Sequence, residues 1–373
     1  MREFMMVLLT AAIVTYLATP LVRLLAVRSG AMTAVRDRDV HSVPIPRLGG
    51  VAMLVGFGAA VLLGSQLPYH GQIFDATPRL YGVLAAAVLI TALGAVDDIR
   101  ELDWMTKLAG QVLAGGIMAF YGVQFESLPI LGVTVLPEPV MVTLTILVVV
   151  ISTNAVNFID GLDGLAAGVV LIAAGAFFGW TYLVSRNFDP PNVFSEATFI
   201  SAALIGVCLG FLPHNFHPAR LFMGDAGALL LGLLLAASTI SMTGSVDPRS
   251  SVATASAATA LLLPILIPLA ILALPFLDMV LAVLRRTRAG QLPWKPDRGH
   301  LHHRMLDIGH SHRRAVVLLY LWSLLIAAGS VSFAYLPGWM ALLGILALLL
   351  IAVALTLRAE PAPSSTGTTG AAR

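Results

Sequence analysis

The sequence predicts an all-α integral membrane protein, on the grounds of its low charge, its high hydropathy and the spacing of its apolar runs. The chain has 373 residues, of which 58% are hydrophobic and 11% are charged, whereas a soluble domain carries roughly 25% charged residues. Its mean hydropathy is +0.89. The apolar residues form runs of about 20, the length that an α-helix needs to cross a bilayer. A soluble protein is therefore excluded.

Eleven apolar runs predict eleven transmembrane helices. The first run is too long for the apolar part of a signal peptide, and no small-residue cleavage site follows it, so we expect this segment to be retained as a helix. Because eleven is odd, the two termini are expected on opposite sides of the membrane. The runs cover residues 4–27, 48–66, 79–96, 105–122, 139–154, 164–185, 196–213, 226–244, 257–284, 315–335 and 338–357.

The basic residues predict an N-terminus outside and a C-terminus in the cytoplasm. Lys and Arg near the ends of spans are retained in the cytoplasm, and this orientation leaves 18 of the 22 basic residues on the inner side. We expect one membrane domain over residues 1–357 and a disordered cytoplasmic tail over 358–373, which is rich in Pro, Ser, Thr and Gly. Cys208 is the one cysteine, which excludes a disulfide framework, and no basic patch interleaved with aromatic residues indicates nucleic acid.

Acidic residues gather on the inner side in this orientation. Carboxylates at membrane depth are costly and usually functional, and those of this chain follow or precede several different runs. The cluster therefore predicts an active site on the cytoplasmic loops. Its members lie at Asp97, Asp98, Glu101 and Asp103, at Asp160 and Asp163, at Asp225, and at Asp297 and Asp307.

The stretch NAVNFIDGLDGLAAG, residues 154–168, is the most informative of these loops. It places two Asn and two Asp within ten residues, and such side chains supply hard oxygen ligands. Intervening glycines let a ligand approach the backbone closely. The alternative is a capped turn at the membrane interface, although a cap requires only one such residue. The polar members are Asn154, Asn157, Asp160 and Asp163.

The stretch LFMGDAG, residues 221–227, places Asp225 at the start of the eighth run. The N-terminus of a helix favours anions, so a carboxylate there could hold a divalent metal against a phosphate. A simple helix cap is the alternative. For Phe222, stacking on a nucleotide base and anchoring in the bilayer both remain open.

Two further loops carry charged candidates. GAVDDIRELDWMTK places Asp97 and Asp98 at the end of the third run, with Lys107 nearby, and this arrangement suits metal or proton chemistry beside a phosphate. The alternative is that this is a solvated surface loop without a catalytic role. DVHSVPIPRLGG supplies Arg47, and Arg suits bidentate contacts to phosphate, although one such residue is a weak signal.

The last polar loop, residues 296–314, holds five of the nine histidines. Zinc is one interpretation, but the absence of cysteine and the oxygen character of the other candidates favour Mg²⁺, with Mn²⁺ as the alternative. His300, His302, His303 and Arg304 are interpreted as donors to phosphate or sugar oxygens. The alternative is a solvated basic loop attracted to anionic lipid, to which we assign His310 and His312.

These stretches together resemble the polyprenyl-phosphate N-acetylhexosamine-1-phosphate transferases (the WecA/MraY type), integral membrane enzymes of the bacterial cell envelope. The resemblance covers roughly residues 35–314 and includes, in order, PRLGG, the DD pair, NxxNFxDGxDGLAxG, FMGDxG and HxHH. The first loop lacks the Lys and Thr-Pro-Thr pattern of the branch that uses UDP-MurNAc-pentapeptide. This difference and the HLHHR motif favour the GlcNAc-1-phosphate branch.

The resemblance implies a reaction and a set of site residues. UDP-GlcNAc and polyprenyl phosphate would yield polyprenyl-diphosphate-GlcNAc and UMP at the bacterial plasma membrane, and a homodimer is left open. Asp225 and Asn157 would ligate Mg²⁺, while Asp97 and Asp98 would lie beside the lipid phosphate. Uridine contacts are implied for Asp160, Asp163 and Phe222, and pyrophosphate and sugar contacts for His300, His302, His303 and Arg304. Catalytic roles are implied for Asp97, Asp98, Asp225, His302 and His303. Further substrate contacts are implied for Arg47, Lys107 and Asn154.

Two alternatives compete with this interpretation. The first is the branch that transfers phospho-MurNAc-pentapeptide. The second, from another class of protein, is an ion-coupled transporter, whose acidic residues should lie near the midplane of the membrane and in repeated halves. The predicted acids lie on one face and no internal repeat is evident, which favours the enzyme.

Overall fold

The computed structural model describes residues 1–32, 44–69, 71, 74, 77–127, 136–186, 195–243, 273–288, 290, 305–333 and 336–358. Within these ranges the regular structure is helical and no β-strand is present. The helices are α1 (Arg2–Ser29), α2 (Gly49–Gln66), α4 (Arg79–Arg100), α5 (Trp104–Phe120), α6 (Glu138–Ile159), α7 (Leu165–Arg186), α8 (Glu196–Asn215), α9 (Gly224–Thr243), α11 (Ala273–Arg288), α13 (His312–Ser332) and α14 (Gly338–Leu357).

Each of the eleven predicted runs coincides with one of these helices, although for the run at 257–284 the structure describes only the part from Ala273 onwards. Eight of the described helices, α1, α4, α6, α7, α8, α9, α13 and α14, are long and apolar enough to cross a membrane. Helix α2 has a shorter apolar segment, Gly49–Gly64. The predicted all-helical membrane architecture is therefore confirmed.

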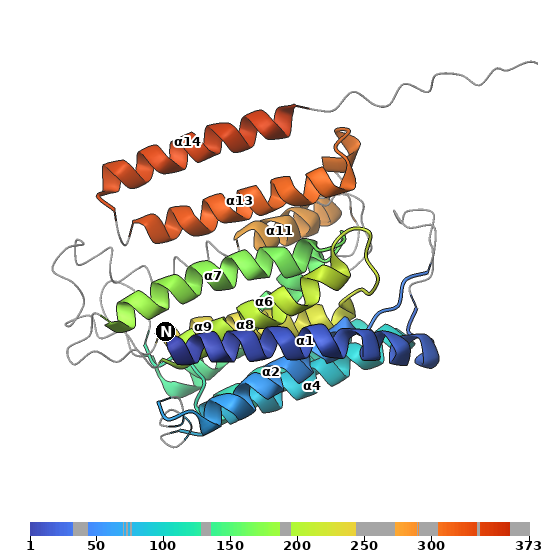
Figure 1. The fold of residues 1–373 in the computed structure, drawn as a ribbon, viewed down its shortest axis with the longest axis vertical. Helices are drawn as coiled ribbons and strands as arrows, with labels where there is room; N and C mark the ends of the chain where they lie inside the picture. Colours follow the sequence, from blue (N-terminus) through green and yellow to red (C-terminus); the bar gives the residue numbers. More distant parts are fainter. Residues whose placement is uncertain are drawn as a thin grey trace, which may run out of the picture.

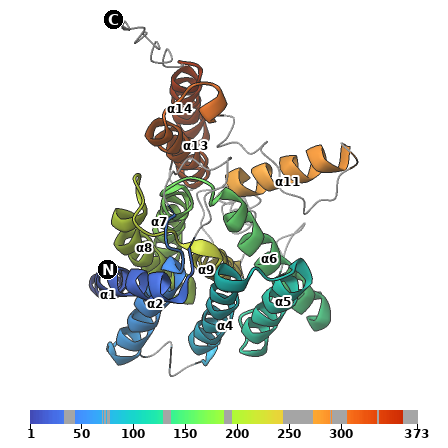
Figure 2. The ribbon, with the colours of Figure 1, turned by 90° about the vertical axis from the view of Figure 1, so that its right-hand side faces the viewer.

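Helix α9 lies at the centre of the bundle (Figure 2) and packs against α2, α4, α6 and α8. Its sequence, GDAGALLLGLLLAASTISMT, is apolar on all sides after the first turn, and a helix of this kind is stable only when it is surrounded. Most of its side chains are fully buried. The polar end of the most buried helix is thus placed among the ends of its neighbours.

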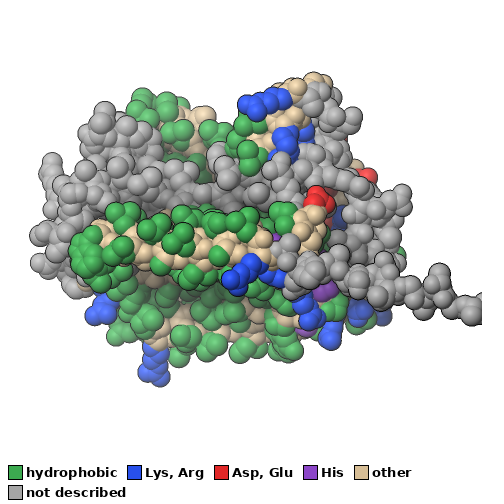
Figure 3. Space-filling model, turned by 90° about the horizontal axis from the view of Figure 1, so that it is seen from above, with side chains coloured by type: hydrophobic (Ala, Val, Ile, Leu, Met, Phe, Trp, Pro, Cys, Tyr) green, Lys and Arg blue, Asp and Glu red, His purple; other side chains and the backbone are tan. Residues whose placement is uncertain are grey.

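Helices α13 and α14 lie at the edge of the bundle (Figure 1). Helix α14 is almost entirely apolar, yet most of its side chains are exposed, and its contact to α13 includes a hydrogen bond from Trp322 Nε1 to Thr356 Oγ1 of 3.1 Å. Figure 3, which views the molecule from the side of α14, shows these hydrophobic side chains as a row along the helix. Such a surface is stable only in an apolar environment such as lipid.

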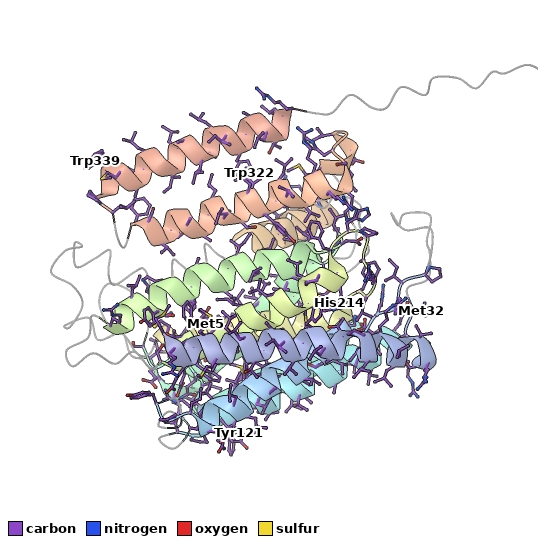
Figure 4. The ribbon with its side chains drawn as sticks, viewed as in Figure 1. Met5, Met32, Tyr121, His214, Trp322 and Trp339 are labelled. Atoms are coloured by element: carbon purple, nitrogen blue, oxygen red, sulfur yellow. The ribbon has the colours of Figure 1, made fainter. Side chains whose placement is uncertain are left out.

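The start of α1 and the end of α14 lie at opposite ends of the bundle. Helix α1 begins at the end where Met5 and Trp339 are labelled, and α14 finishes at the end where Met32 and His214 are labelled (Figures 1 and 4). The number of crossings and the side of the membrane on which each helix end lies stay predictions.

Glycines allow α2 and α4 to approach the beginning of α9 closely. A Cβ at Gly50 would lie 2.1 Å from the backbone nitrogen of Gly227, and a Cβ at Gly94 would lie 2.4 Å from that of Ala226. Both contacts are with backbone atoms, which cannot rotate away. The position of the α9 N-terminus therefore depends on the absence of side chains at these two residues.

We expect Gly50→Ala and Gly94→Ala to lower the stability of the protein, because overpacking costs about 1–3 kcal/mol. Gly116→Ala is the matched control, since nothing lies within 4 Å of its added Cβ. Thermal unfolding in detergent micelles measures the difference. Equal melting temperatures for Gly50→Ala and Gly116→Ala would contradict the close packing described here.

Candidate active site

The predicted site residues on α4, α5, α6 and α9 meet at one end of the bundle, the end where α1 finishes (Figure 1). The C-terminal turns of α4 and α6 and the N-terminal turns of α5 and α9 contribute side chains there. Loops before α2 and α9 complete it. Hydrogen bonds in this region join segments that are remote in the sequence, such as Asp98 with Ala226 and Pro46 with Phe222.

The loop before α2 pairs with the loop before α9 through the backbone. The N–H of Phe222 donates to the carbonyl of Pro46 at 2.9 Å, and the N–H of Gly49 donates to the carbonyl of Phe222 at 3.0 Å. A third bond joins the N–H of Gly50 to the carbonyl of Met223, also at 3.0 Å. The PRLGG and FMGD motifs are thus parts of one structure, which places the partly exposed Arg47 and Phe222 beside the beginning of α9.

Asp98 holds the N-terminus of α9. Its Oδ1 accepts a hydrogen bond from the N–H of Asp225 at 3.0 Å, and its Oδ2 accepts one from the N–H of Ala226 at 3.2 Å. These N–H groups have no partner within their own helix, and a carboxylate at the positive end of a helix is favourable. Gly224 has a φ of +67°, and a Cβ there would lie 2.2 Å from Asp98 Oδ2, so only glycine fits.

Lys107 bridges the other two carboxylates. Its Nζ lies 2.5 Å from Asp97 Oδ2 and 2.8 Å from Asp225 Oδ2. Asp97 Oδ1 also accepts the N–H of Leu102 at 2.6 Å. Two carboxylates thus share one ammonium group, and Asp98 follows Asp97 directly in the sequence. This local excess of negative charge suits a further cation.

Asn157 reaches the same carboxylate from α6. Its Nδ2 donates to Asp225 Oδ1 at 3.0 Å. The predicted convergence of Asn157 and Asp225 is therefore present in the structure. A half-turn of the amide would present the oxygen of Asn157 instead of its nitrogen on the same side.

Asn154, one turn before Asn157, has a different partner. Its Nδ2 donates to Gln111 Oε1 and to the carbonyl of Val150, both at 2.7 Å. Gln111 is 2% exposed and was not predicted as a site residue. Its position four residues after Lys107, on the same face of a helix, is the signal that could have identified it.

Asp160 caps the C-terminus of α6 and lies close enough to Asp225 to sense its charge. Burial and the repulsion from Asp225 raise the pKa of the Asp160 carboxyl to about 7, while the nearby guanidinium of Arg47 opposes this rise. A bound cation would reverse the repulsion and favour the ionised form.

Asp163 lies in a separate cluster with two histidines. It is 3% exposed, and its Oδ2 accepts hydrogen bonds from His217 Nδ1 at 2.8 Å and from the N–H of Ala219 at 3.0 Å. Its own N–H donates to His312 Nε2 at 3.1 Å. A direct contact with a nucleotide would require these bonds to open.

The interpretation of His310 and His312 as solvated loop residues is wrong. His310 is buried and its Nε2 pairs with the carbonyl of Thr356 at 2.8 Å, while His312 begins α13 and contacts Asp163. His300, His302, His303 and Arg304 lie outside the described residues. Their contacts to pyrophosphate and sugar stay predictions.

The residues at the start of α9 fit a hard divalent cation. Carboxylate oxygens of Asp225 and Asp97 and the amide of Asn157 are joined to one another directly or through Lys107. Oxygen donors of this kind are the ones that Mg²⁺ and Mn²⁺ prefer. In the structure the ammonium of Lys107 neutralises part of this charge.

We expect Asp98→Ala to lower the rate of UMP release, the reaction that the resemblance implies, at least about 100-fold. Without Asp98 the start of α9 can shift, and a small displacement of Asp225 misaligns the site. Asp103→Ala is the matched control: Asp103 caps α5 by accepting the N–H groups of Met105 and Thr106, and its carboxylate makes no hydrogen bond to Asp225 or Lys107. Its turnover should stay close to that of the wild type. Similar turnover in both variants would show that Asp98 does not position the site.

Comparisons with known proteins agree with the site. The family model for glycosyl transferase family 4 matches residues 80–243. The decaprenyl-phosphate N-acetylglucosaminephosphotransferase of Mycolicibacterium smegmatis is 46% identical over 336 residues, which are 89% of this chain and 82% of that protein. The probable undecaprenyl-phosphate N-acetylglucosaminyl 1-phosphate transferase of Bacillus subtilis is 33% identical over 341 residues, 91% and 86% of the two chains.

A more distant relative is the phospho-N-acetylmuramoyl-pentapeptide-transferase of Desulforudis audaxviator, which is 34% identical over 224 residues, 54% of this chain and 64% of that protein. The region that the family model matches, residues 80–243, includes the helices whose ends form the Lys107–Asp225 cluster. The chain therefore belongs to the polyprenyl-phosphate N-acetylhexosamine-1-phosphate transferases of glycosyl transferase family 4.

Proposed function

We propose that the protein transfers GlcNAc-1-phosphate from UDP-GlcNAc to a polyprenyl phosphate, releasing UMP and forming polyprenyl-diphosphate-GlcNAc. The convergence of Asp97, Lys107, Asn157 and Asp225 at the N-terminus of α9 is the observation that carries this proposal. The names of the relatives support it, since those that cover most of the chain are named for N-acetylglucosamine phosphotransfer to decaprenyl or undecaprenyl phosphate.

UDP-MurNAc-pentapeptide is the alternative donor. The relatives named for phospho-N-acetylmuramoyl-pentapeptide transfer match a smaller share of this chain, 54% in one case and 63% in another. The greater coverage by the N-acetylglucosamine phosphotransferases favours UDP-GlcNAc. Because relatives are named for both decaprenyl and undecaprenyl phosphate, the lipid is proposed as a polyprenyl phosphate of either length.

In the proposed reaction, an oxygen of the lipid phosphate attacks the sugar-bearing phosphorus of UDP-GlcNAc. A new phosphorus–oxygen bond forms, the bond from that phosphorus to the bridging oxygen breaks, and UMP leaves with the electron pair. A phosphate monoester with a second pKa near 6 is largely ionised at pH 7. A general base is therefore optional for the attacking oxygen, and we place Asp97 and Asp98 beside the lipid phosphate, with Asp97 also holding Lys107.

The side chains of the chain supply positioning and charge for this step. Mg²⁺, with Mn²⁺ as the alternative, would be held by Asp225 and Asn157 and would neutralise charge on the reacting phosphates. Lys107 places an ammonium group beside the same carboxylates, and Arg47 offers a guanidinium suited to phosphate oxygens. We assign nucleotide contacts to Phe222, Asp160 and Asp163, and a further substrate contact to Asn154. Phosphate and sugar contacts are assigned to His300, His302, His303 and Arg304.

The proposed placement in the membrane has eleven spans in one domain over residues 1–357, an outer N-terminus and a cytoplasmic C-terminus. It sets the active site at the inner boundary of a bacterial plasma membrane. The excess of Lys and Arg in the inner loops supports this orientation. Anionic UDP-GlcNAc and the phosphate of the lipid could then meet at one end of the bundle.

Purified protein incubated with polyprenyl phosphate, Mg²⁺ and UDP-GlcNAc should release UMP, and omission of the lipid or of Mg²⁺ should stop the release. Asp225→Asn should lower the rate about 1,000-fold, a loss typical of a preorganised electrostatic group. Release from UDP-MurNAc-pentapeptide alone would overturn the choice of donor. If no nucleotide sugar yields UMP, the proposal that the protein is a transferase is overturned and a transporter is favoured.

A further inference from the structure

A small cavity lies on the flank of the bundle between α1 and the end of α8. Its volume is about 260 Å³, and its walls come from the C-terminal half of α1, from His214 near the end of α8 and from the loop before α9. His214 lies at the same end of the molecule as Met32 (Figure 4). The neighbouring leucines of α1, Leu21, Leu24 and Leu25, are exposed, so the cavity is on a flank that faces lipid.

The cavity is separate from the Lys107–Asp225 cluster. In Figure 2, α1 and α8 lie on one side of α9, and α4 and α5, which carry Asp97 and Lys107, lie on the other. None of the residues that line the cavity is among those for which the family resemblance implies a substrate contact. A ligand in the cavity would therefore lie apart from the reacting phosphates.

Two arginines from distant parts of the chain line the cavity. Arg23 belongs to α1, and Arg220 belongs to the loop before α9, 197 residues later. The Nε of Arg23 donates to the carbonyl of Arg220 at 3.2 Å, which joins the two segments. Among the described residues, no carboxylate forms an ion pair with either guanidinium. Two positive charges thus meet at one cavity without a described counterion, and an anion would neutralise them.

Arg23 lies inside an apolar segment, more than one helical turn before α1 ends at Ser29. A charged side chain at such a depth is costly unless it reaches polar groups at the membrane boundary. Within the described part of the chain, one of the five N–H donors of its guanidinium has a partner. The other donors suit phosphate oxygens, which a guanidinium binds through two parallel hydrogen bonds.

The rest of the cavity wall is largely apolar. Pro20 and Leu24 of α1 and Leu221 of the loop contribute to it. Leu24 is 55% exposed, whereas Leu221 is fully buried, so apolar side chains reach from the floor of the cavity to the lipid-facing surface. A pair of cations beside such a wall matches an amphipathic molecule with an anionic head and a hydrocarbon tail. Basic pockets between transmembrane helices bind the head groups of anionic lipids in this way.

We propose that the cavity binds the phosphate of an anionic phospholipid between Arg23 and Arg220, with the apolar part of the lipid against Leu24. The bound lipid connects α1 to the loop before α9. This loop continues to Phe222, whose N–H pairs with the carbonyl of Pro46, so the lipid stabilises the backbone beside the proposed active site. The inference does not depend on the identity of the substrates.

The test is the lipid selectivity of the full-length protein in a neutral detergent, measured by native mass spectrometry with equal amounts of phosphatidylglycerol and phosphatidylcholine. The wild type should retain one phosphatidylglycerol in preference, and Arg23→Gln or Arg220→Gln should bind it about fivefold more weakly. Arg28→Gln is the matched control, because Arg28 is exposed in the last turn of α1 and does not line the cavity. Equal binding by the wild type and both cavity variants would overturn the proposal, as would equal retention of the two lipids by the wild type.

Thermal unfolding of the same proteins shows whether each variant is folded and gives a second readout. Phosphatidylglycerol should raise the melting temperature of the wild type and of Arg28→Gln, because a ligand that binds the native state stabilises it. The rise should be smaller for Arg23→Gln. Glycerol 3-phosphate at the same concentration should give no comparable rise, and an equal rise would indicate a site for free phosphate and overturn the choice of a lipid.

If neither cavity variant folds, a displacement experiment on the wild type decides the question. Polyprenyl phosphate, added in an amount that saturates UMP release, should leave the phosphatidylglycerol bound, because the two lipids occupy different flanks of α9. Loss of the phosphatidylglycerol would place it in the substrate site and overturn the proposal.

Discussion

The structure depends on the compensation of three carboxylates that lie where apolar helices end. Lys107 pairs with Asp97 and Asp225, and Asp98 accepts two backbone N–H groups at the start of α9. Because an uncompensated carboxylate at this depth is costly, these contacts fix the relative positions of α4, α5 and α9. The same arrangement leaves a net negative site that suits a divalent cation.

The packing of the bundle serves this arrangement. Helix α9 is buried on all sides, so its N-terminus has little freedom, and Gly50 and Gly94 allow α2 and α4 to contact its first turn. The backbone pairing of the two loops at Pro46 and Phe222 adds a further constraint. Residues that are remote in the sequence thus meet at one end of the bundle.

Hydropathy alone predicted the helices well, because runs of about 20 apolar residues have few alternatives in lipid. The convergence of Asn157 and Asp225 was implied by the resemblance to the family; the hydropathy pattern added only that both residues lie at span ends on the same expected face. The separate roles of Asp97 and Asp98 were not: adjacency in the sequence does not say which carboxylate faces Lys107 and which faces the backbone of α9. Nor did any local pattern connect Gln111 with Asn154.

The histidines show a different limit of sequence reasoning. His217 lies in a loop outside the recognised motifs, and His312 was assigned to a solvated loop, yet both contact Asp163. Their contact depends on how α13 packs against α7, and hydropathy does not determine which helices become neighbours. Side chains from three distant segments can be brought together only by the tertiary structure.

The central claim, that one hard cation is shared by side chains from α6 and α9, is tested most directly by an experimental structure with Mn²⁺ in place of Mg²⁺. Anomalous scattering locates Mn²⁺ without reference to the surrounding density. The account predicts an anomalous peak within coordination distance of both Asp225 and Asn157. A peak bound elsewhere, with Lys107 still between Asp97 and Asp225, would contradict it.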